Sequence, residues 1–116
     1  MDEISSPRAQ KLARQIQRDI SDIFQRDPSY LVPGVMVSVT VVRMSPDLSF
    51  AKIYVSVFPF DRHDEVLSKL KDGAWSVRKA LAAKMRNQIK SIPEIAFYLD
   101  DSLEYADSIE TALRKL

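Results

Sequence analysis

The sequence is 116 residues long, the size of one domain with a single core, and its lack of cysteine excludes disulfides, thiolate metal sites and cysteine nucleophiles. Hydrophobic residues make up 46% and charged residues 28% of the chain, which excludes a fully disordered protein. The formal net charge of +1 is unevenly distributed, with 15 basic and eight acidic side chains over residues 8–90 but two and six over residues 94–116, which indicates a polyanion-binding body followed by an acidic tail.

The first expected element is an amphipathic helix that begins at Pro7. Ser6 followed by Pro7 is typical of an N-cap and a first helical residue. Apolar residues then recur every three or four positions, which is the period of one helical face. The helix should end near Arg26, because Pro28 disfavours the helical conformation of Asp27. The apolar stripe consists of Ala9, Leu12, Ala13, Ile16, Ile20, Ile23 and Phe24.

Two alternating segments predict a β-hairpin. Residues 35–44 and 50–58 are rich in valine and isoleucine and alternate with the period of two that is typical of strands. Between them, Ser-Pro-Asp-Leu at 45–48 predicts a turn in which proline presets the backbone. On the first strand Val37, Val39 and Val41 alternate with Ser38 and Thr40, and on the second Ala51, Ile53, Val55 and Val57 share one side.

The second half of the chain predicts helices on either side of a kink. After a linker over residues 59–64, a short helix through Val66 and Leu70 meets Gly73, which weakens a helix locally. Helical periodicity resumes and continues to Ile89, so two helices joined by a kink are expected before Pro93.

A third strand and a last helix complete the predicted fold. Residues 95–99 alternate as a strand, and Asp101 with Glu104 forms a capping box that would open the helix. The order of elements predicts an α+β fold with a three-stranded mixed sheet, covered on one face by helices. The residues expected to be buried are Ile16, Ile20, Val39, Ile53, Val55, Leu81, Met85 and Phe97.

The first helix carries a basic row opposite its apolar stripe. This row is a candidate phosphate-binding surface. A merely solvated face is the alternative, because Asp22 lies in the same arc of the helical wheel and Asp19 flanks it. The basic residues in the arc are Arg8, Lys11, Arg14, Arg18 and Arg26.

Residues 73–93 form the most basic stretch, with five basic and no acidic residues. On a continuous helix Lys79, Arg86 and Lys90 would share one line that a phosphate could approach. Arg78 would fall inside the apolar arc, so it must snorkel, pair or mark a register break. Lys84 is the fifth basic residue.

Aromatic residues offer surfaces on which bases could stack. Trp75, the only tryptophan, is expected in the core beside Val77, with base stacking as the alternative. Phe50, Tyr54 and Phe58 share a strand face that could also stack bases, unless the last helix covers it.

The sequence offers no set of residues typical of an enzyme. His63 is the only histidine, so a metal site or a catalytic triad lacks partners, and two glycines are too few for a phosphate loop. Asp100 and Asp101 would point to opposite sides of a strand. We therefore expect no catalysis, no cofactor and no metal. The absence of an apolar segment of about 20 residues, and the acidic start at residues 1–3, predict a cytoplasmic protein.

Several motifs in order along the chain resemble the ribosome-binding factor A family. They are Ser-Pro-Asp-Leu at 45–48, Ala-Lys-Ile-Tyr-Val at 51–55, Pro-Glu-Ile at 93–95 with Phe97, and Asp-Ser-Leu at 101–103. The first helix is also similar, so the resemblance covers about residues 6–109. The sequence departs from the family at Gly-Ala-Trp-Ser, residues 73–76, where the family has a small pair of alanine and glycine, and two extra residues precede Pro93.

The resemblance implies a single-domain type II KH-like fold in which a kinked helix pair replaces the usual GxxG loop. It also implies a non-enzymatic, monomeric bacterial factor that binds the immature 30S subunit through 16S rRNA and assists late maturation and cold adaptation. The implied organisation is a disordered N-terminus at 1–5, an RNA-binding domain at 6–100 and an acidic C-terminal helix at 101–116. The alternative is a protein–protein adaptor that docks a partner through the strand face or the terminal helix.

The candidate RNA-binding residues combine the two basic regions. Family members keep basic residues at the positions of Arg8, Lys11, Arg18, Arg78 and Arg86. The full candidate set is Arg8, Lys11, Arg14, Arg18, Arg78, Lys79, Lys84, Arg86 and Lys90.

Overall fold

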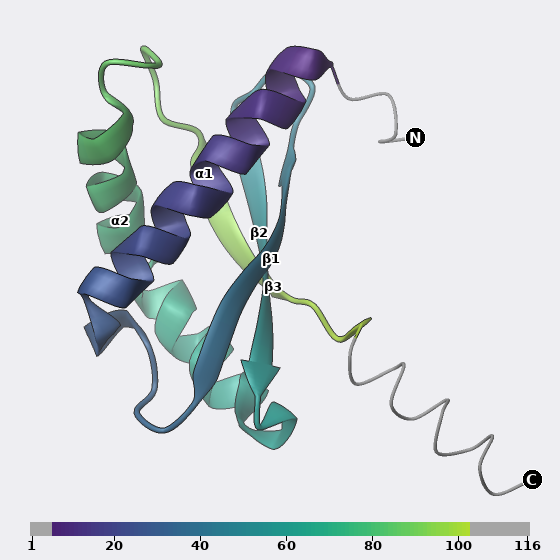
Figure 1. Ribbon diagram of the computed structural model, residues 1–116, viewed down its shortest axis with the longest axis vertical. Helices are drawn as coiled ribbons and strands as arrows, with labels where there is room; N and C mark the ends of the chain where they lie inside the picture. Colours follow the sequence, from purple (N-terminus) through teal and green to yellow (C-terminus); the bar gives the residue numbers. More distant parts are fainter. Residues whose placement is uncertain (1–5, 103–116) are drawn as a thin grey trace, which may run out of the picture.

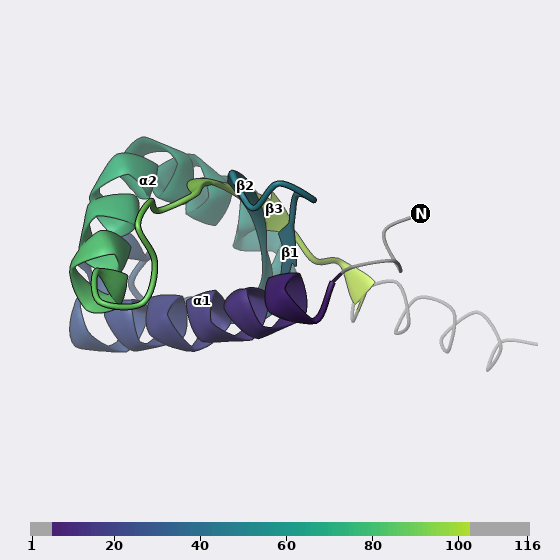
Figure 2. The ribbon, with the colours of Figure 1, turned by 90° about the horizontal axis from the view of Figure 1, so that it is seen from above.

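The structure, a computed structural model, describes residues 6–102 (Figure 1). The expected disordered segment at 1–5 and nearly all of the expected terminal helix lie outside these residues. Seen from the side and from above, both helices cover one face of the sheet (Figures 1 and 2). The elements in chain order are α1 (Pro7–Arg26), the 3-10 turn η2 (Pro28–Tyr30), β1 (Met36–Met44), β2 (Phe50–Phe58), the 3-10 turn η3 (Phe60–Arg62), α2 (His63–Met85) and β3 (Glu94–Leu99).

The first helix begins and ends at the predicted residues. The Ser6 hydroxyl accepts a hydrogen bond from the backbone N–H of Ala9 at 3.0 Å, and Pro7 occupies the first helical position. At the other end, the Asp27 carboxylate accepts from the backbone N–H of Ser29 at 3.2 Å and caps η2. The helix prediction is confirmed.

In the described part of the chain, the sheet has three strands in the order β1-β2-β3. β1 and β2 pair antiparallel, whereas β2 and β3 pair parallel, as expected of a mixed sheet. Ile53 on the central strand lies between Val42 of β1 and Phe97 of β3. The predicted α+β fold with a mixed sheet is confirmed.

The alternation predicted for β1 is wrong beyond Val39, because a β-bulge shifts the register between Val39 and Val41. The extra residue is Thr40, after which Val42 is buried and Val41 is 37% exposed. The Gln17 side chain of α1 donates to the carbonyl oxygens of Val39 and Thr40, at 3.2 and 3.3 Å, and so supports the bulge. Strand periodicity alone could not reveal an inserted residue, since valine suits either face.

The predicted pair of helices is one continuous helix, α2, that includes Gly73. Its ribbon bends along its length (Figures 1 and 2), so the expected kink is present as a bend without a break. The side of Gly73 faces the ring of Tyr30, and a Cβ atom placed there would lie 3.5 Å from Tyr30 Cδ1. The helix ends at Met85, so the expectation that it continues to Ile89 is wrong.

Trp75 was expected in the core but is 69% exposed. On a continuous helix it lies about 200° from Val77, which is buried, and so faces the opposite side. The prediction failed because it weighed proximity along the chain above the direction of the side chain.

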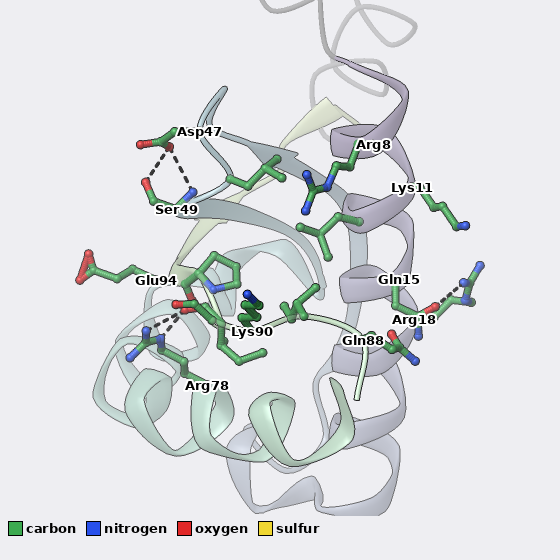
Figure 3. A pocket seen from close by; sticks show the side chains of 16 residues that line it. Arg8, Lys11, Gln15, Arg18, Asp47, Ser49, Arg78, Gln88, Lys90 and Glu94 are labelled. Carbon is green, nitrogen blue, oxygen red and sulfur yellow. Dashed lines mark hydrogen bonds between the residues drawn. The ribbon is translucent and has the colours of Figure 1, made fainter. Parts of the chain in front are cut away.

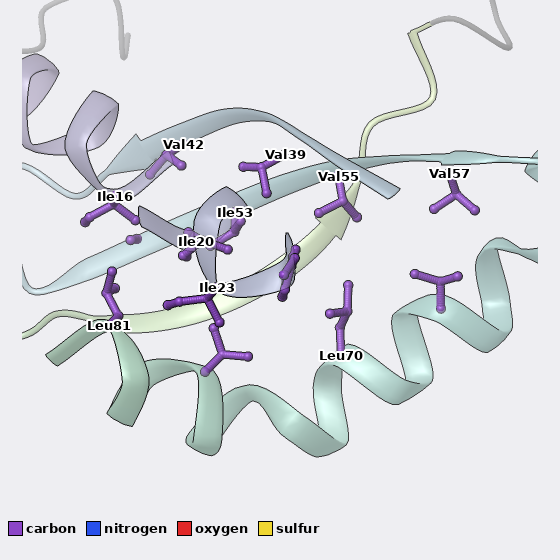
Figure 4. Packing of buried hydrophobic residues seen from close by; sticks show 14 of the residues in the cluster. Ile16, Ile20, Ile23, Val39, Val42, Ile53, Val55, Val57, Leu70 and Leu81 are labelled. Carbon is purple, nitrogen blue, oxygen red and sulfur yellow. The ribbon is translucent and has the colours of Figure 1, made fainter. Parts of the chain in front are cut away.

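The core lies between the helices and the sheet (Figure 4). Of the eight residues expected there, seven are buried, and Phe97 is half-buried and packs against the core. Burying a side chain such as Ile53 or Leu81 contributes roughly 1.5–3 kcal/mol. In the described residues, neither helix is long and apolar enough to cross a membrane. The fully buried side chains of largest volume are Ile16, Ile20, Ile53, Val55, Val66, Leu70, Val77, Leu81 and Met85.

The bulge predicts different costs for two adjacent valines. Val42→Ala should lower the free energy of unfolding by roughly 1.5–3 kcal/mol, because it removes two buried methyl groups. Val41→Ala, on the exposed side, should change it by less than about 0.5 kcal/mol. Urea denaturation measures both variants, and a larger loss for Val41→Ala would show that β1 lacks the bulge.

Candidate nucleic-acid interface

A groove of about 1260 Å³ lies beside α1 (Figure 3). Its walls are the first half of α1, the turn between β1 and β2, and the loop between α2 and β3. Five basic and two acidic residues occur among the described residues that line it. The basic residues are Arg8, Lys11, Arg18, Arg78 and Lys90, and the acidic ones are Asp47 and Glu94.

The α1 wall contributes three of the predicted cations. Arg8 projects from the helix into the groove, whereas Lys11 and Arg18 lie at its rim and point to the outer side (Figure 3). The Arg18 guanidinium donates to Gln15 Oε1 at 2.7 Å, and Gln15 donates in turn to the Asp19 carboxylate at 3.0 and 3.1 Å. Arg8 is therefore the α1 cation aimed most directly into the groove.

The turn wall is organised by the Asp47 carboxylate. It accepts hydrogen bonds from the Ser45 hydroxyl at 2.8 Å, and from the hydroxyl and backbone N–H of Ser49 at 2.7 and 3.1 Å. These bonds, with the Ser49 hydroxyl the strongest cause, lower the pKa of Asp47 to about 2. Leu48 takes a left-handed conformation with φ of 63°, which allows the chain to reverse within the turn.

The loop wall is fastened by Arg78. Its guanidinium donates to the carbonyl oxygens of Pro93 at 3.0 Å and Ile92 at 2.9 Å. Of the three possibilities for this inward-facing arginine, pairing is therefore the one observed. The backbone N–H of Glu94 donates to the Ser49 carbonyl at 2.9 Å and joins the loop to the turn. In Figure 3, Lys90 lies between Arg78 and α1.

The predicted basic line through Lys79, Arg86 and Lys90 does not exist as one helical row. Because α2 ends at Met85, Arg86 is at its C-cap and Lys90 belongs to the loop. The structure brings Lys90 into the groove and leaves Lys79 and Arg86 outside its lining. The helix periodicity that suggested the row extended beyond the residues that are helical.

Lys84 forms a contact within the fold. Its ammonium lies 2.6 Å from the Asp22 carboxylate, which also pairs with Arg26 at 2.8 Å. The hydrogen bond from Lys84, followed by that from Arg26, lowers the pKa of Asp22. The pair joins α2 to α1, so Lys84 has a structural role that the sequence did not reveal. Arg14 is exposed on α1 and does not line the groove.

Sequence periodicity missed the loop residues of the groove. Gln88, Ile89, Ser91 and Ile92 line it with polar and apolar groups; the first two lie where a helix was expected, and the last two belong to no periodic segment. The available signal was the pair of motifs at 45–48 and 93–95, which the fold brings together. In residues 6–102, no group of three histidine or acidic side chains is arranged to hold a metal ion.

The family model described as ribosome-binding factor A matches residues 8–113. The chain belongs to the ribosome-binding factor A family. It is 42% identical to ribosome-binding factor A of Cytophaga hutchinsonii over 97% of this chain and 85% of that one. It is also 39% identical to the protein of Chlorobaculum tepidum, over 96% of this chain and 92% of that one.

Solved ribosome-binding factor A structures share the fold. The crystal structure from Thermus thermophilus has a TM-score of 0.63 and 25% identity over 78% of this chain and 94% of that one. A homology model of the Thermus protein, fitted into an electron cryo-microscopy map of a 30S complex, has the same score and identity over 80% of this chain and 96% of that one. The Thermotoga maritima structure, of a putative ribosome-binding factor A, has a TM-score of 0.66 and 26% identity over 79% and 86% of the chains. The fold of this chain is therefore KH-like, as the resemblance implied.

Arg78 should stabilise the protein through its two carbonyl contacts. Arg78→Gln should lower the free energy of unfolding by about 1.5–3 kcal/mol, because charged hydrogen bonds are lost and carbonyls are left unpaired. Arg78→Lys, which keeps the charge without the forked geometry, should lose part of this stability. Lys79→Gln, on the exposed side, is the matched control and should change it by less than about 0.5 kcal/mol. Equal losses of stability at both positions in urea denaturation would argue against this role of the Arg78 hydrogen bonds.

The Asp47 turn should respond to acid in a defined range. Because the pKa of Asp47 in the folded protein is about 2, below the ordinary value of 3.8, its contribution to stability is present above pH 4 and is lost as the pH falls through about 2. An NMR titration of the carboxyl should give a midpoint near 2, and Ser49→Ala should raise it. A midpoint near 3.8 in the wild type would mean that the turn hydrogen bonds are not formed in solution.

Proposed function

We propose that this protein is a non-enzymatic factor of the bacterial cytoplasm that binds the immature 30S subunit through 16S rRNA and assists its late maturation, including at low temperature. Membership of the ribosome-binding factor A family supports ribosome binding, and the 30S complex of the Thermus protein supports the subunit. In this proposal residues 6–100 form the RNA-binding domain, the protein acts as a monomer, and the acidic segment from residue 101 is a separate helix that tunes affinity.

The groove is the observation that supports the proposed RNA contact. Cations from α1 and from the α2–β3 loop, far apart in the sequence, lie around one opening about 1260 Å³ in volume. Five basic against two acidic lining residues among those described give it an excess of positive charge. Lysine and arginine that neutralise phosphates release counterions, which drives binding to RNA of any sequence. Shape then selects the site, as is common for folded RNA.

The candidate residues do not contribute equally to the proposed RNA-binding site. Arg8 and Lys90 are the main phosphate contacts, with Lys11 and Arg18 at the rim. Arg78 positions the loop through its carbonyl contacts. Lys84 binds Asp22 and would act on RNA only through the fold. The remaining candidates, Arg14, Lys79 and Arg86, are exposed outside the groove.

No covalent step is required for this function. A factor that binds one RNA conformation more tightly than another shifts their populations by the difference in binding free energy. Holding an unfinished RNA conformation at the groove would favour its ordered maturation, and release would follow when the mature conformation binds less tightly.

A protein–protein adaptor is the second candidate, and the open face of the sheet favours it. Among the described residues, Met36, Val41, Phe58 and Tyr98 are large hydrophobic side chains that are 37–72% exposed. Exposed apolar patches of this kind often mark protein-binding surfaces. An adaptor of this type would bind its partner independently of the groove cations.

Charge reversal in the groove tests the proposal. Arg8→Glu with Lys90→Glu should abolish cosedimentation with small subunits from an immature pool, because phosphate contacts become repulsive. The control variant, Lys52→Glu with Lys69→Glu, changes the net charge by the same amount outside the groove. It should largely preserve cosedimentation. In milder alanine variants, each lost contact should reduce the slope of log affinity against log salt by about 0.7–0.9.

Circular dichroism must show that both double variants keep the native fold. Normal cosedimentation by the folded groove variant would contradict the groove as the RNA contact. Equal loss in the two double variants would indicate attraction by net charge without a defined site. Binding of wild type to mature subunits as tight as to immature ones would contradict a role in maturation.

A further inference from the structure

Trp75 is an exposed tryptophan that lies outside the groove. Its side chain is 69% exposed on α2, although tryptophan is among the residues that gain most from burial. It does not line the groove, and it faces away from the buried stripe of its own helix. Nothing in the packing of the described residues accounts for a large aromatic ring at this position.

The surroundings of Trp75 are basic. Lys71 and Lys79 lie one helical turn before and after it, and all three side chains are exposed. The Lys79 ammonium lies 5.3 Å from the centre of the indole ring, within the range of a cation–π interaction. Asp72, three residues before Trp75 and also exposed, is the one acidic residue on this side of the described helix near the ring, and no acidic residue follows it before Glu94. The exposed ring therefore lies in a positively charged stretch of helix.

We propose that Trp75 is a stacking platform for an unpaired base of single-stranded RNA, with Lys71 and Lys79 contacting the adjoining phosphates. The inference rests on the RNA binding proposed above and adds a second contact to it. Every base has a π-face that can stack on an aromatic side chain, and lysines supply the complementary charge for the backbone. The Lys79 ammonium lies over one face of the ring, so a base would stack on the other face or displace it, and the lysine would then bind the phosphate beside that base.

Trp75 also lies next to the groove along the helix. Arg78, which lines the groove, is three residues away and therefore on the next turn of α2. An RNA strand that leaves the groove past the Arg78 and Lys90 side could continue onto the Trp75 surface. The basic charge of this stretch favours a polyanion over an apolar protein surface as the occupant.

Phe58 provides a matched comparison. It is 72% exposed, like Trp75, but it lies at the end of β2 on the open face of the sheet and pairs with Met36 in the β1–β2 register. A general benefit of exposed aromatic surface for RNA binding would affect both residues. A stacking site built by the basic stretch of α2 would affect Trp75 alone.

The test uses Trp75 as its own probe, because it is the only tryptophan of the chain. Titration with a single-stranded RNA of about 12 nucleotides should quench its fluorescence to saturation, whereas a duplex of the same length should quench it much less, because its bases are already stacked. The affinity for the single strand is measured separately, by anisotropy of a dye-labelled copy.

Variants then separate stacking from general RNA binding. Trp75→Leu should weaken single-strand binding roughly 5-fold to 100-fold, and Trp75→Phe should recover part of it. Phe58→Leu should leave the affinity within about twofold of wild type, since it lies outside the basic stretch. The exposure of both positions means that circular dichroism should stay native in all three variants.

Each result has a defined meaning. Tight RNA binding without quenching, or with unchanged affinity in Trp75→Leu, would overturn the stacking site and leave the proposed function standing. A loss of 30S binding in Trp75→Leu with unchanged oligonucleotide affinity would also overturn it and assign the ring to a protein contact. Failure of the wild type to bind any RNA at low salt would overturn the proposed function together with this inference.

Discussion

The parallel pairing of β3 with β2 is the constraint on which the rest of the structure depends. Parallel neighbours cannot be joined by a tight turn, so the chain must cross the face of the sheet, and α2 is that crossover. Because β3 starts beside Phe50, the loop that follows α2 returns to the end of the sheet that carries the hairpin turn. The first half of α1 lines the same end, and the groove arises where the three segments meet.

Some basic residues of this domain form contacts within the fold and are not available to an anionic partner. Lys84 pairs with Asp22 between the two helices, and Arg78 donates to two carbonyl oxygens, so both cations stabilise the fold. Arg8 and Lys90 are instead directed to the groove, and Lys79 interacts with the exposed ring of Trp75. A count of basic residues therefore overstates the surface that phosphates could approach, and the fold decides which cations remain available for an anionic partner.

Part of the candidate site could be predicted from the sequence. The helical wheel identified Arg8, Lys11 and Arg18 because a regular helix fixes the relative direction of its side chains. The family motifs at 45–48 and 93–95 identified two segments that meet through the Ser49 and Glu94 backbone. In the loop that completes the lining, Lys90 was a candidate, although it was placed on a helical row that does not exist. The other loop residues of the lining were not predicted, since irregular backbone has no period from which direction can be inferred.

The sequence by itself determined the ends of α1, the hairpin, the mixed sheet and most of the core, because caps, turns and periodic burial are local properties of the chain. Tertiary structure decided where the core-facing side of β1 changes, where α2 ends and which groups Arg78 binds. The bulge at Thr40 is supported by Gln17 from another element, and the loop after Met85 is fastened by Arg78 to Ile92 and Pro93. Such contacts join residues distant in sequence, so no local pattern could specify them.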